Sequence, residues 1–317
     1  MNFRRAGHRL PLSVSENDMN CLIETDAFRH AAQLLARNLV AIYSSAPRTA
    51  GLFASQQRWF LCHAALAHHF RALDNREPGL TRRAIGNLAR QYGISSRNTA
   101  YAFFDEALKY GVIRPVQGDD SVAARLVEPS PETLSLLKHW YFVHFQALDA
   151  IDDGDRAARF AVQPDSVLAL IQQSVSPALL TNQSLYHPGP LYTIFTWADS
   201  GGLLMDRLIA GMDHHENGEQ SSFLTDVSAI SHLAQSFGLS RAHASRKLAA
   251  AEAIGGVGWN GVRGRSRIWI SRSFYVEYAR AMANKLAILD EAFAEICERL
   301  MPVSENANQD VCCADSQ

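Results

Sequence analysis

LARQYGIS, residues 88–95, recurs with few changes as LAQSFGLS, residues 233–240. In both segments, apolar residues at helical spacing lead to a glycine, and a serine follows two residues later. Gly93 and Gly238 predict a left-handed position at which a helix ends, because glycine adopts that conformation without steric cost. The serine predicts the cap of a second helix. The chain is therefore expected to contain two helix-turn-helix motifs.

A hairpin is expected after each helix-turn-helix. The side-chain oxygen of Ser, Thr or Asp can accept the first free N–H groups of a helix. The expected caps are Thr81 and Ser95 or Ser96 in the first copy, and Thr225 or Asp226 and Ser240 in the second. Short runs of β-type residues then predict two hairpins. Their strands are Val112–Val116 with Ala123–Val127, and Val257–Trp259 with Arg267–Ile270, with turns at Gly118-Asp119 and at Asn260-Gly261 or Gly264. This order of elements is typical of a winged helix.

The rest of the chain is expected to be mainly helical, because apolar residues recur at three- and four-residue spacing. The expected longer helices are Ala27–Ile42, Leu52–Leu73, Glu132–Ile151, Leu191–Met212 and Ser273–Leu300. Charge and proline in residues 152–165 predict a linker between two units. The expected division is an N-terminal arm (1–26), a first winged-helix unit with flanking helices (27–151), the linker (152–165), a second such unit (166–301) and a disordered tail (302–317).

Composition agrees with a globular protein of two compact domains. The chain has 317 residues, of which 47% are hydrophobic and 20% charged, enough apolar residues for sizeable cores. Its net charge of −2 predicts that any affinity for nucleic acid comes from a local patch. No apolar run is long enough for a signal peptide or a membrane span. We therefore expect a cytoplasmic protein that does not associate with membranes.

The second motif resembles a known family. GLSRAHASRKL, residues 238–248, resembles the helix-turn-helix of bacterial winged-helix transcription regulators of the MarR group. ISSRNTAYAFFDEALKYGVI, residues 94–113, is similar to the same element and to the recognition helix of the GntR group. The resemblance extends over roughly residues 50–150 and 190–300.

MarR-like proteins are usually homodimers whose first and last helices form the interface. The resemblance thus implies two winged-helix units fused in one chain as a pseudo-dimer, with long helices at the interface. The fold class expected is mainly α with short β-hairpin wings. Such a chain would act as a monomer or associate again as a homodimer.

Candidate DNA-contacting residues follow from the chemistry of the two motifs. Cationic side chains bind phosphates, and hydrogen-bonding side chains read base edges. The candidates in the first copy are Arg82, Arg83, Ser96, Arg97, Asn98, Thr99 and Tyr101. Those in the second are Arg241, His243, Ser245, Arg246 and Lys247 in the helix, and Arg263, Arg265 and Arg267 in the wing. The first wing instead carries Asp119 and Asp120. The second copy is therefore expected to dominate non-specific binding and the first to matter more for sequence choice, on an asymmetric DNA site.

A small-molecule effector is a further expectation from the resemblance. In MarR-like regulators a small aromatic ligand binds between the interface helices and the winged helix. Residues expected near that place are Trp59, His63, Tyr192 and Trp197. Packing in the core is the alternative for such aromatic side chains. The histidines 63, 68, 69, 214 and 215 raise the possibility of a metal site, but we expect them to face solvent near helix ends and expect no metal.

These patterns predict a DNA-binding transcription regulator that reads successive major grooves with two recognition helices, and that acts as a repressor. Two alternatives remain open: a plasmid-type replication initiator, and a winged-helix adaptor that binds protein partners without DNA. No nucleophile-elbow, phosphate-loop, dinucleotide-binding or zinc-protease motif is present, so neither enzymatic activity nor a cofactor is expected.

Overall fold

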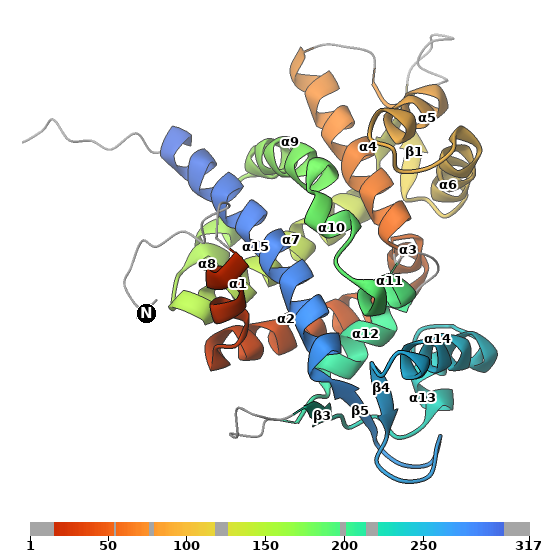
Figure 1. Cartoon of the computed structure of the whole chain (residues 1–317). Coiled ribbons are helices and arrows are strands. Elements are labelled where there is room, and N and C mark those ends of the chain that lie inside the picture. The colour runs from red at the N-terminus through yellow and green to blue at the C-terminus, as the bar shows by residue number, and fades with distance from the viewer. Residues whose placement is uncertain are drawn as a thin grey trace, which may run out of the picture.

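A computed structural model describes residues 16–53, 55–75, 79–117, 126–196, 201–213 and 221–300. It is mainly helical and has two small antiparallel sheets (Figure 1). The first half comprises α1 (Glu16–Ile23), α2 (Asp26–Ser45), α3 (Pro47–Leu52), α4 (Gln56–Asn75), α5 (Arg82–Gln91), α6 (Arg97–Lys109), β1 (Ile113–Pro115), β2 (Val127–Pro129) and α7 (Pro131–Asp152). The second half comprises α8 (Arg156–Ala161), α9 (Asp165–Thr181), α10 (Gln183–Tyr186), α11 (Pro190–Thr196), α12 (Gly201–Ala210), β3 (Ser222–Leu224), α13 (Ile230–Gln235), α14 (Arg241–Ala253), β4 (Val257–Trp259), β5 (Ile268–Ser271) and α15 (Arg272–Leu300). Among the residues described, no helix is both long and apolar enough to cross a membrane.

The two glycines end their helices in the same way. Gly93 has φ 64° and Gly238 has φ 62°, the left-handed conformation that the sequence predicts. In the first copy the N–H of Ile94 donates to the carbonyl of Ala89 (2.8 Å), and in the second that of Leu239 donates to Ala234 (3.0 Å). The backbone therefore ends α5 and α13 in the same way, but the first turn has one more residue before its serine cap, because Ser96 lies three residues after Gly93 and Ser240 two residues after Gly238.

Three of the expected caps are present and one is wrong. The backbone N–H of Ala84 donates to Thr81 Oγ1 (3.0 Å), and Ser96 and Ser240 cap α6 and α14 through N–H groups three residues on. Thr225 does not cap α13, which begins only at Ile230. Its hydroxyl instead donates to the carbonyl of Ile268 (2.8 Å), because the chain here still follows β5 as an extended segment.

The two hairpins form close to the expected positions. In the first hairpin, Ile113 pairs with Pro129. Its second strand, β2, therefore ends at Pro129, two residues after the expected end at Val127. In the second, Val257 pairs with Ile270. An unexpected strand, β3, completes this sheet in the order β3-β5-β4. The hairpin turn expected at residues 118–119 lies outside the described residues.

The early helices of each half pack against the other half. Helix α2 lies against α7 of its own half and α12 of the other, whereas α9 lies against α15 of its own half and α4 of the other. Buried glutamines make matching contacts: the Nε2 of Gln33 in α2 donates to the carbonyl of Met212 (2.6 Å), and that of Gln172 in α9 donates to His63 (3.0 Å). One hydrophobic cluster runs from Leu22 to Ile296 as a result.

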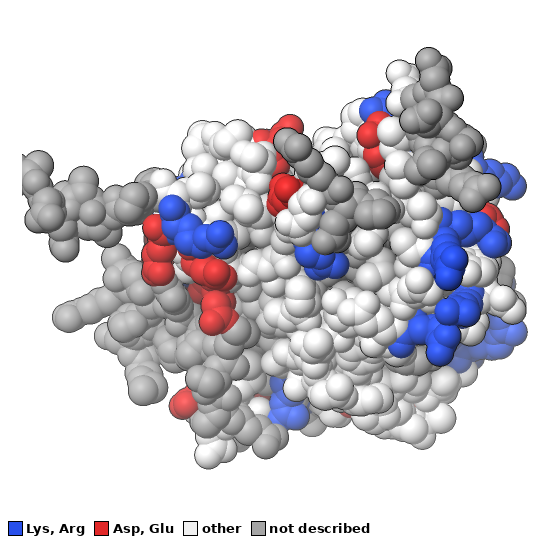
Figure 2. Space-filling model, turned by 90° about the horizontal axis from the view of Figure 1, so that it is seen from above, with Lys and Arg blue, Asp and Glu red and all other residues white. Residues whose placement is uncertain are grey.

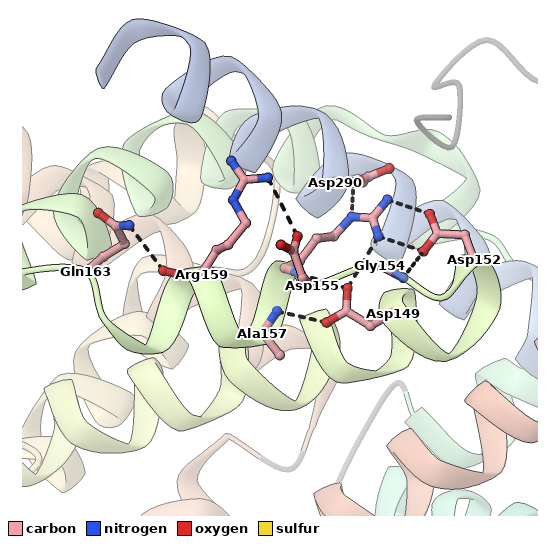
Figure 3. Close-up of polar contacts among 9 residues, drawn as sticks. Asp149, Asp152, Gly154, Asp155, Ala157, Arg159, Gln163 and Asp290 are labelled. Carbon is pink, nitrogen blue, oxygen red and sulfur yellow. Dashed lines mark hydrogen bonds and ion pairs between the residues drawn. The ribbon is translucent and has the colours of Figure 1, made fainter. Parts of the chain in front are cut away.

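The stretch expected to be a linker is a folded junction (Figure 3). It contains α8, and Arg156 at the start of this helix is surrounded by aspartates. Its Nε lies 2.6 Å from Asp290 Oδ1 in α15, and its Nη2 lies 2.7 Å from Asp152 Oδ2 at the end of α7. Asp149 Oδ2 accepts the backbone N–H of Ala157 (2.9 Å). Since an unpaired buried charge is costly, these groups hold α7, α8 and α15 together.

Two of the expected long helices have different bounds. Residues 191–212 do not form one helix: α11 ends at Thr196 and α12 begins at Gly201, and residues 197–200 lie outside the described part. The expected helix from residue 52 is likewise two elements, because α3 ends at Leu52 and α4 begins at Gln56. The tail at 302–317 and the arm before residue 16 are outside the described residues, but the rest of the arm includes α1, which packs on α15.

Candidate functional site

Both helix-turn-helix segments lie on the same side of the molecule. In Figure 1, α5, α6, α13 and α14 all occupy the right-hand side. Figure 2 keeps that side on the right, and most of the Lys and Arg surface in this view gathers along it. The exposed cations of these segments that have no acidic partner among the described residues include Arg83 and Arg97 in the first copy, and Arg241, Arg246 and Arg265 in the second.

Helix α14 presents cations outward from a small-residue face. Ala244, Leu248 and Ala251 are buried, so the opposite side of the helix faces solvent. Arg241 and Arg246 are exposed on it. No aspartate or glutamate of the described residues forms an ion pair with either arginine, or with Arg265 of the hairpin. Their charges are therefore available to an external anion.

Other cations predicted for DNA in the second copy have structural roles instead. The Nζ of Lys247 turns inward and donates to the carbonyl of Ile194 in α11 (2.7 Å), so this side chain does not extend from the outer face of α14 in the structure. Arg267 is held at the base of the sheet, where its Nη2 lies 2.6 Å from Asp213 Oδ2. The sequence did not indicate these contacts, because the spacing of residues along the chain does not reveal which other element lies against a side chain.

Of the remaining second-copy candidates, Arg263 is exposed but already paired, and two others are half-buried. Arg263 lies over the ring of Trp259 at 4.7 Å and pairs with Glu252 at 3.0 Å. His243 and Ser245 are half-buried. The outward surface of α14 is thus narrower than predicted and consists mainly of Arg241 and Arg246.

The first copy presents mostly uncharged polar side chains beside three arginines, one of which is paired with an acid. The exposed candidates here are Arg82, Arg83, Ser96, Arg97, Asn98 and Thr99, and Tyr101 is half-buried. Arg82 makes two hydrogen bonds to Asp105, at 2.9 and 2.8 Å, and its guanidinium lies 4.2 Å from the centroid of the Tyr101 ring. Arg97 donates to the side-chain oxygen of Asn87 at 3.3 Å. Asp119 and Asp120 of the first wing lie outside the described residues.

A tyrosine from each half reaches the helix-turn-helix of the other half. The hydroxyl of Tyr43, near the end of α2, donates to the carbonyl of Phe237 (2.8 Å). The hydroxyl of Tyr186, at the end of α10, donates to the carbonyl of Tyr92 (3.4 Å). Each acceptor is the residue immediately before the glycine of the turn. The position of each helix-turn-helix therefore depends on the other half, which the sequence reasoning missed because these partners are distant in the chain.

A cavity of about 220 Å³ lies where the two halves meet. Three of the four predicted pocket residues, Trp59, His63 and Tyr192, line it. The fourth, Trp197, lies outside the described residues. The remaining lining is mostly apolar and comes from α2, α4, α7, α12 and α15 among others.

The cavity also holds two charged groups that the sequence reasoning missed. Burial lowers the pKa of Lys285 to about 8. Burial also raises the pKa of Asp206 to about 6, although Tyr278 donates a hydrogen bond to its carboxylate (2.9 Å). The sequence did contain a signal for the lysine. Lys285 lies on an apolar face of residues 272–300, where Met282, Leu286 and Leu289 are its buried helix neighbours.

Two histidines are buried rather than solvent-facing, contrary to expectation. His63 is 3% and His69 9% exposed. Burial, together with the charge of Lys285, lowers the pKa of His63 to about 3, so its ring is neutral. Histidines 214 and 215 lie outside the described residues. In the described part of the chain, no group of three or more His, Cys, Asp or Glu side chains is arranged to hold a metal ion.

Comparison with protein-family models, with curated proteins and with solved structures gives no match for this chain. Its function is therefore inferred from the residues and contacts described above.

Proposed function

We propose that the chain is a sequence-specific DNA-binding transcription regulator built from two winged-helix units in a pseudo-dimeric arrangement. The main support for this proposal comes from α14, a helix that Ser240 caps directly after a glycine turn. Arg241 and Arg246 are exposed on this helix, and neither forms an ion pair with an acid among the described residues. The major groove of B-form DNA admits an α-helix of this kind. Exposed arginines at its start and along its outer face suit phosphates and guanine edges.

Two recognition helices in one chain would bind DNA as the two subunits of a dimeric regulator do. Helices α6 and α14 each follow a left-handed glycine and a serine cap, and they lie on the same side of the molecule (Figure 1). Paired recognition helices contact half-sites about one helical turn, or ~34 Å, apart. The exchanged packing of α2 and α9 and the two tyrosine contacts fix the separation of these helices. Binding at a promoter would then repress transcription by occupying it.

The first test measures DNA binding by the full chain and its Arg246→Ala variant. Selection from genomic fragments should return sites that bind with an affinity that falls as salt rises, because released counterions contribute to binding. Arg246→Ala should weaken binding to the selected site by about 1–3 kcal/mol if this side chain contacts a base edge. Arg299→Ala is the matched control, since Arg299 is an exposed arginine on the far end of α15.

Three results would contradict or redirect the proposal. Absence of salt-dependent binding to any fragment would overturn DNA binding and favour a protein-binding adaptor. Equal losses in Arg246→Ala and Arg299→Ala would remove the assigned role of α14. Selected fragments that come from a replication origin with repeated sites, rather than from promoters, would identify the initiator instead of the regulator.

A further inference from the structure

The cavity between the halves contains one cationic side chain, Lys285, in a mostly apolar lining that also includes Asp206. Lys285 lies in the middle of α15 and is 9% exposed. Its Nζ lies 5.0 Å from the centroid of the Trp59 ring and 3.8 Å from the sulfur of Met282. Both are weak partners for an ammonium group. Among the described residues, no carboxylate oxygen lies within 4.0 Å of Lys285 Nζ, the distance limit for an ion pair.

A buried ammonium normally has a strong acceptor, because an unpaired charge in the interior is costly. Asp206 stabilises the charge of Lys285 without forming an ion pair with it, and its carboxylate accepts a hydrogen bond from Tyr278. His63 is neutral because of its burial and the nearby Lys285 charge. Lys285 therefore has unused capacity to bind one negatively charged group.

The remaining lining suits an apolar body beside that charge. The aromatic residues Phe53, Trp59, Trp140 and Tyr192 and a set of leucines form most of the wall. A cavity of about 150 Å³ accommodates benzene, and this one is larger, at about 220 Å³. One or two rings, or a short aliphatic chain, would fill it.

We propose that this cavity binds a small apolar monocarboxylate, with the carboxylate on Lys285 Nζ and the apolar part against Trp59 and Trp140. The predicted pocket residues Trp59, His63 and Tyr192 form part of the cavity wall. Lys285 makes the site selective for an anion. The site is inferred independently of DNA binding. Because both halves line the cavity, occupancy would also change the relative positions of α6 and α14, and only that consequence rests on the proposed function.

The direct test is calorimetric titration of the full chain without DNA. The probes are indole-3-carboxylate, benzoate and octanoate, and the matched neutral probe is indole-3-carboxamide. Indole-3-carboxylate should bind at least tenfold more tightly than the amide near neutral pH. Lys285→Met should lose at least tenfold of carboxylate affinity and leave amide affinity nearly unchanged. Lys109→Met is the control variant, because Lys109 also lies over an aromatic ring, that of Tyr110, but is exposed.

The pH dependence provides a second measurement. Affinity for the carboxylate should fall as pH rises through about 8, where Lys285 loses its proton. It should also fall as pH rises through about 6, because ionised Asp206 repels a second carboxylate. The other titratable groups near Lys285 change little in this range: burial lowers the pKa of His63 and His144 and raises those of Cys62, Tyr141, Tyr192 and Tyr278.

Several outcomes would overturn the site. These are no heat with any of the three carboxylates at millimolar concentration, equal affinity for acid and amide, or unchanged affinity in Lys285→Met. Thermal unfolding of that variant shows whether it is folded, and we expect a higher melting temperature than in the wild type because a buried charge has been removed. DNA titrations are separate experiments, so their failure would leave the ligand site standing.

Discussion

Helices α6 and α14 begin with a similar backbone conformation, but they expose different side chains. Each follows a left-handed glycine and a serine cap, with φ values of 64° at Gly93 and 62° at Gly238. In α14, Arg241 and Arg246 are exposed and have no acidic partner among the described residues. Helix α6 has one exposed arginine, Arg97, which donates to Asn87 (3.3 Å), and the neighbouring Arg82 of α5 is paired with Asp105. The residues that set the local fold are therefore not the residues that set the surface charge of each copy. The second copy is expected to supply most of the charge-driven binding, and the first to add sequence choice.

The largest expected effect comes from removing both outward cations of α14. The variant Arg241→Ala/Arg246→Ala should lose about 2–6 kcal/mol of affinity for the selected site, taking about 1–3 kcal/mol for each contact. Fluorescence anisotropy with labelled duplex measures this. If the equivalent first-copy variant, Arg83→Ala/Arg97→Ala, costs as much, the two copies contribute equally and the comparison fails.

The first copy should affect sequence choice more than overall affinity. Asn98 is exposed at the start of α6, and an asparagine amide can make two hydrogen bonds to adenine. Asn98→Ala should cost about 1–3 kcal/mol on the selected site and nothing on random DNA. Competition between the two duplexes gives the ratio directly. A uniform loss on both would show that Asn98 contacts only phosphate, and no loss would show that α6 does not read DNA.

The two tyrosine contacts should differ in strength. Removing a buried hydroxyl leaves its carbonyl acceptor unsatisfied, which costs about 1–3 kcal/mol. Tyr43→Phe should approach this loss in unfolding free energy, because its hydrogen bond is 2.8 Å long. Tyr186→Phe should cost less, because its bond is 3.4 Å long. Urea denaturation measures both, and Tyr110→Phe, on an exposed tyrosine, serves as the control. Equal losses in all three would show that neither contact holds the turns.

The smallest effect is expected in the second hairpin. Arg265 is exposed on it and suits a phosphate contact rather than a base. Arg265→Ala should weaken binding to all duplexes similarly and reduce the slope of log affinity against log salt by about one. A salt series on specific and random DNA measures this slope. An unchanged slope, or a loss confined to one sequence, would contradict a phosphate contact.

The sequence predicted the local features of the fold well, because these depend on neighbouring residues. Gly93, Gly238, Thr81, Ser96 and Ser240 all act as their chemistry predicts. The hairpins were placed within a few residues. The cap at Thr225 was wrong because β5, some forty residues later in the chain, holds that hydroxyl at 2.8 Å from Ile268.

The candidate sites were predicted less completely, because they depend on which elements meet. Trp59, His63 and Tyr192 do lie at one cavity, yet Lys285 and Asp206 were missed. The spacing of residues 272–300 places Lys285 on an apolar face of its helix, but it does not indicate which residues of other elements face this lysine.

The sequence by itself determined two copies of a glycine-turned, serine-capped helix pair followed by a hairpin, because each step depends on short-range hydrogen bonds and backbone sterics. The tertiary structure decided how the copies combine. It placed α2 and α9 against opposite halves, turned Lys247 inward, folded residues 152–165 into a charged junction around Arg156 and left Lys285 facing an apolar cavity. Each of these depends on side chains far apart in the chain, whose contacts form only when the whole core packs.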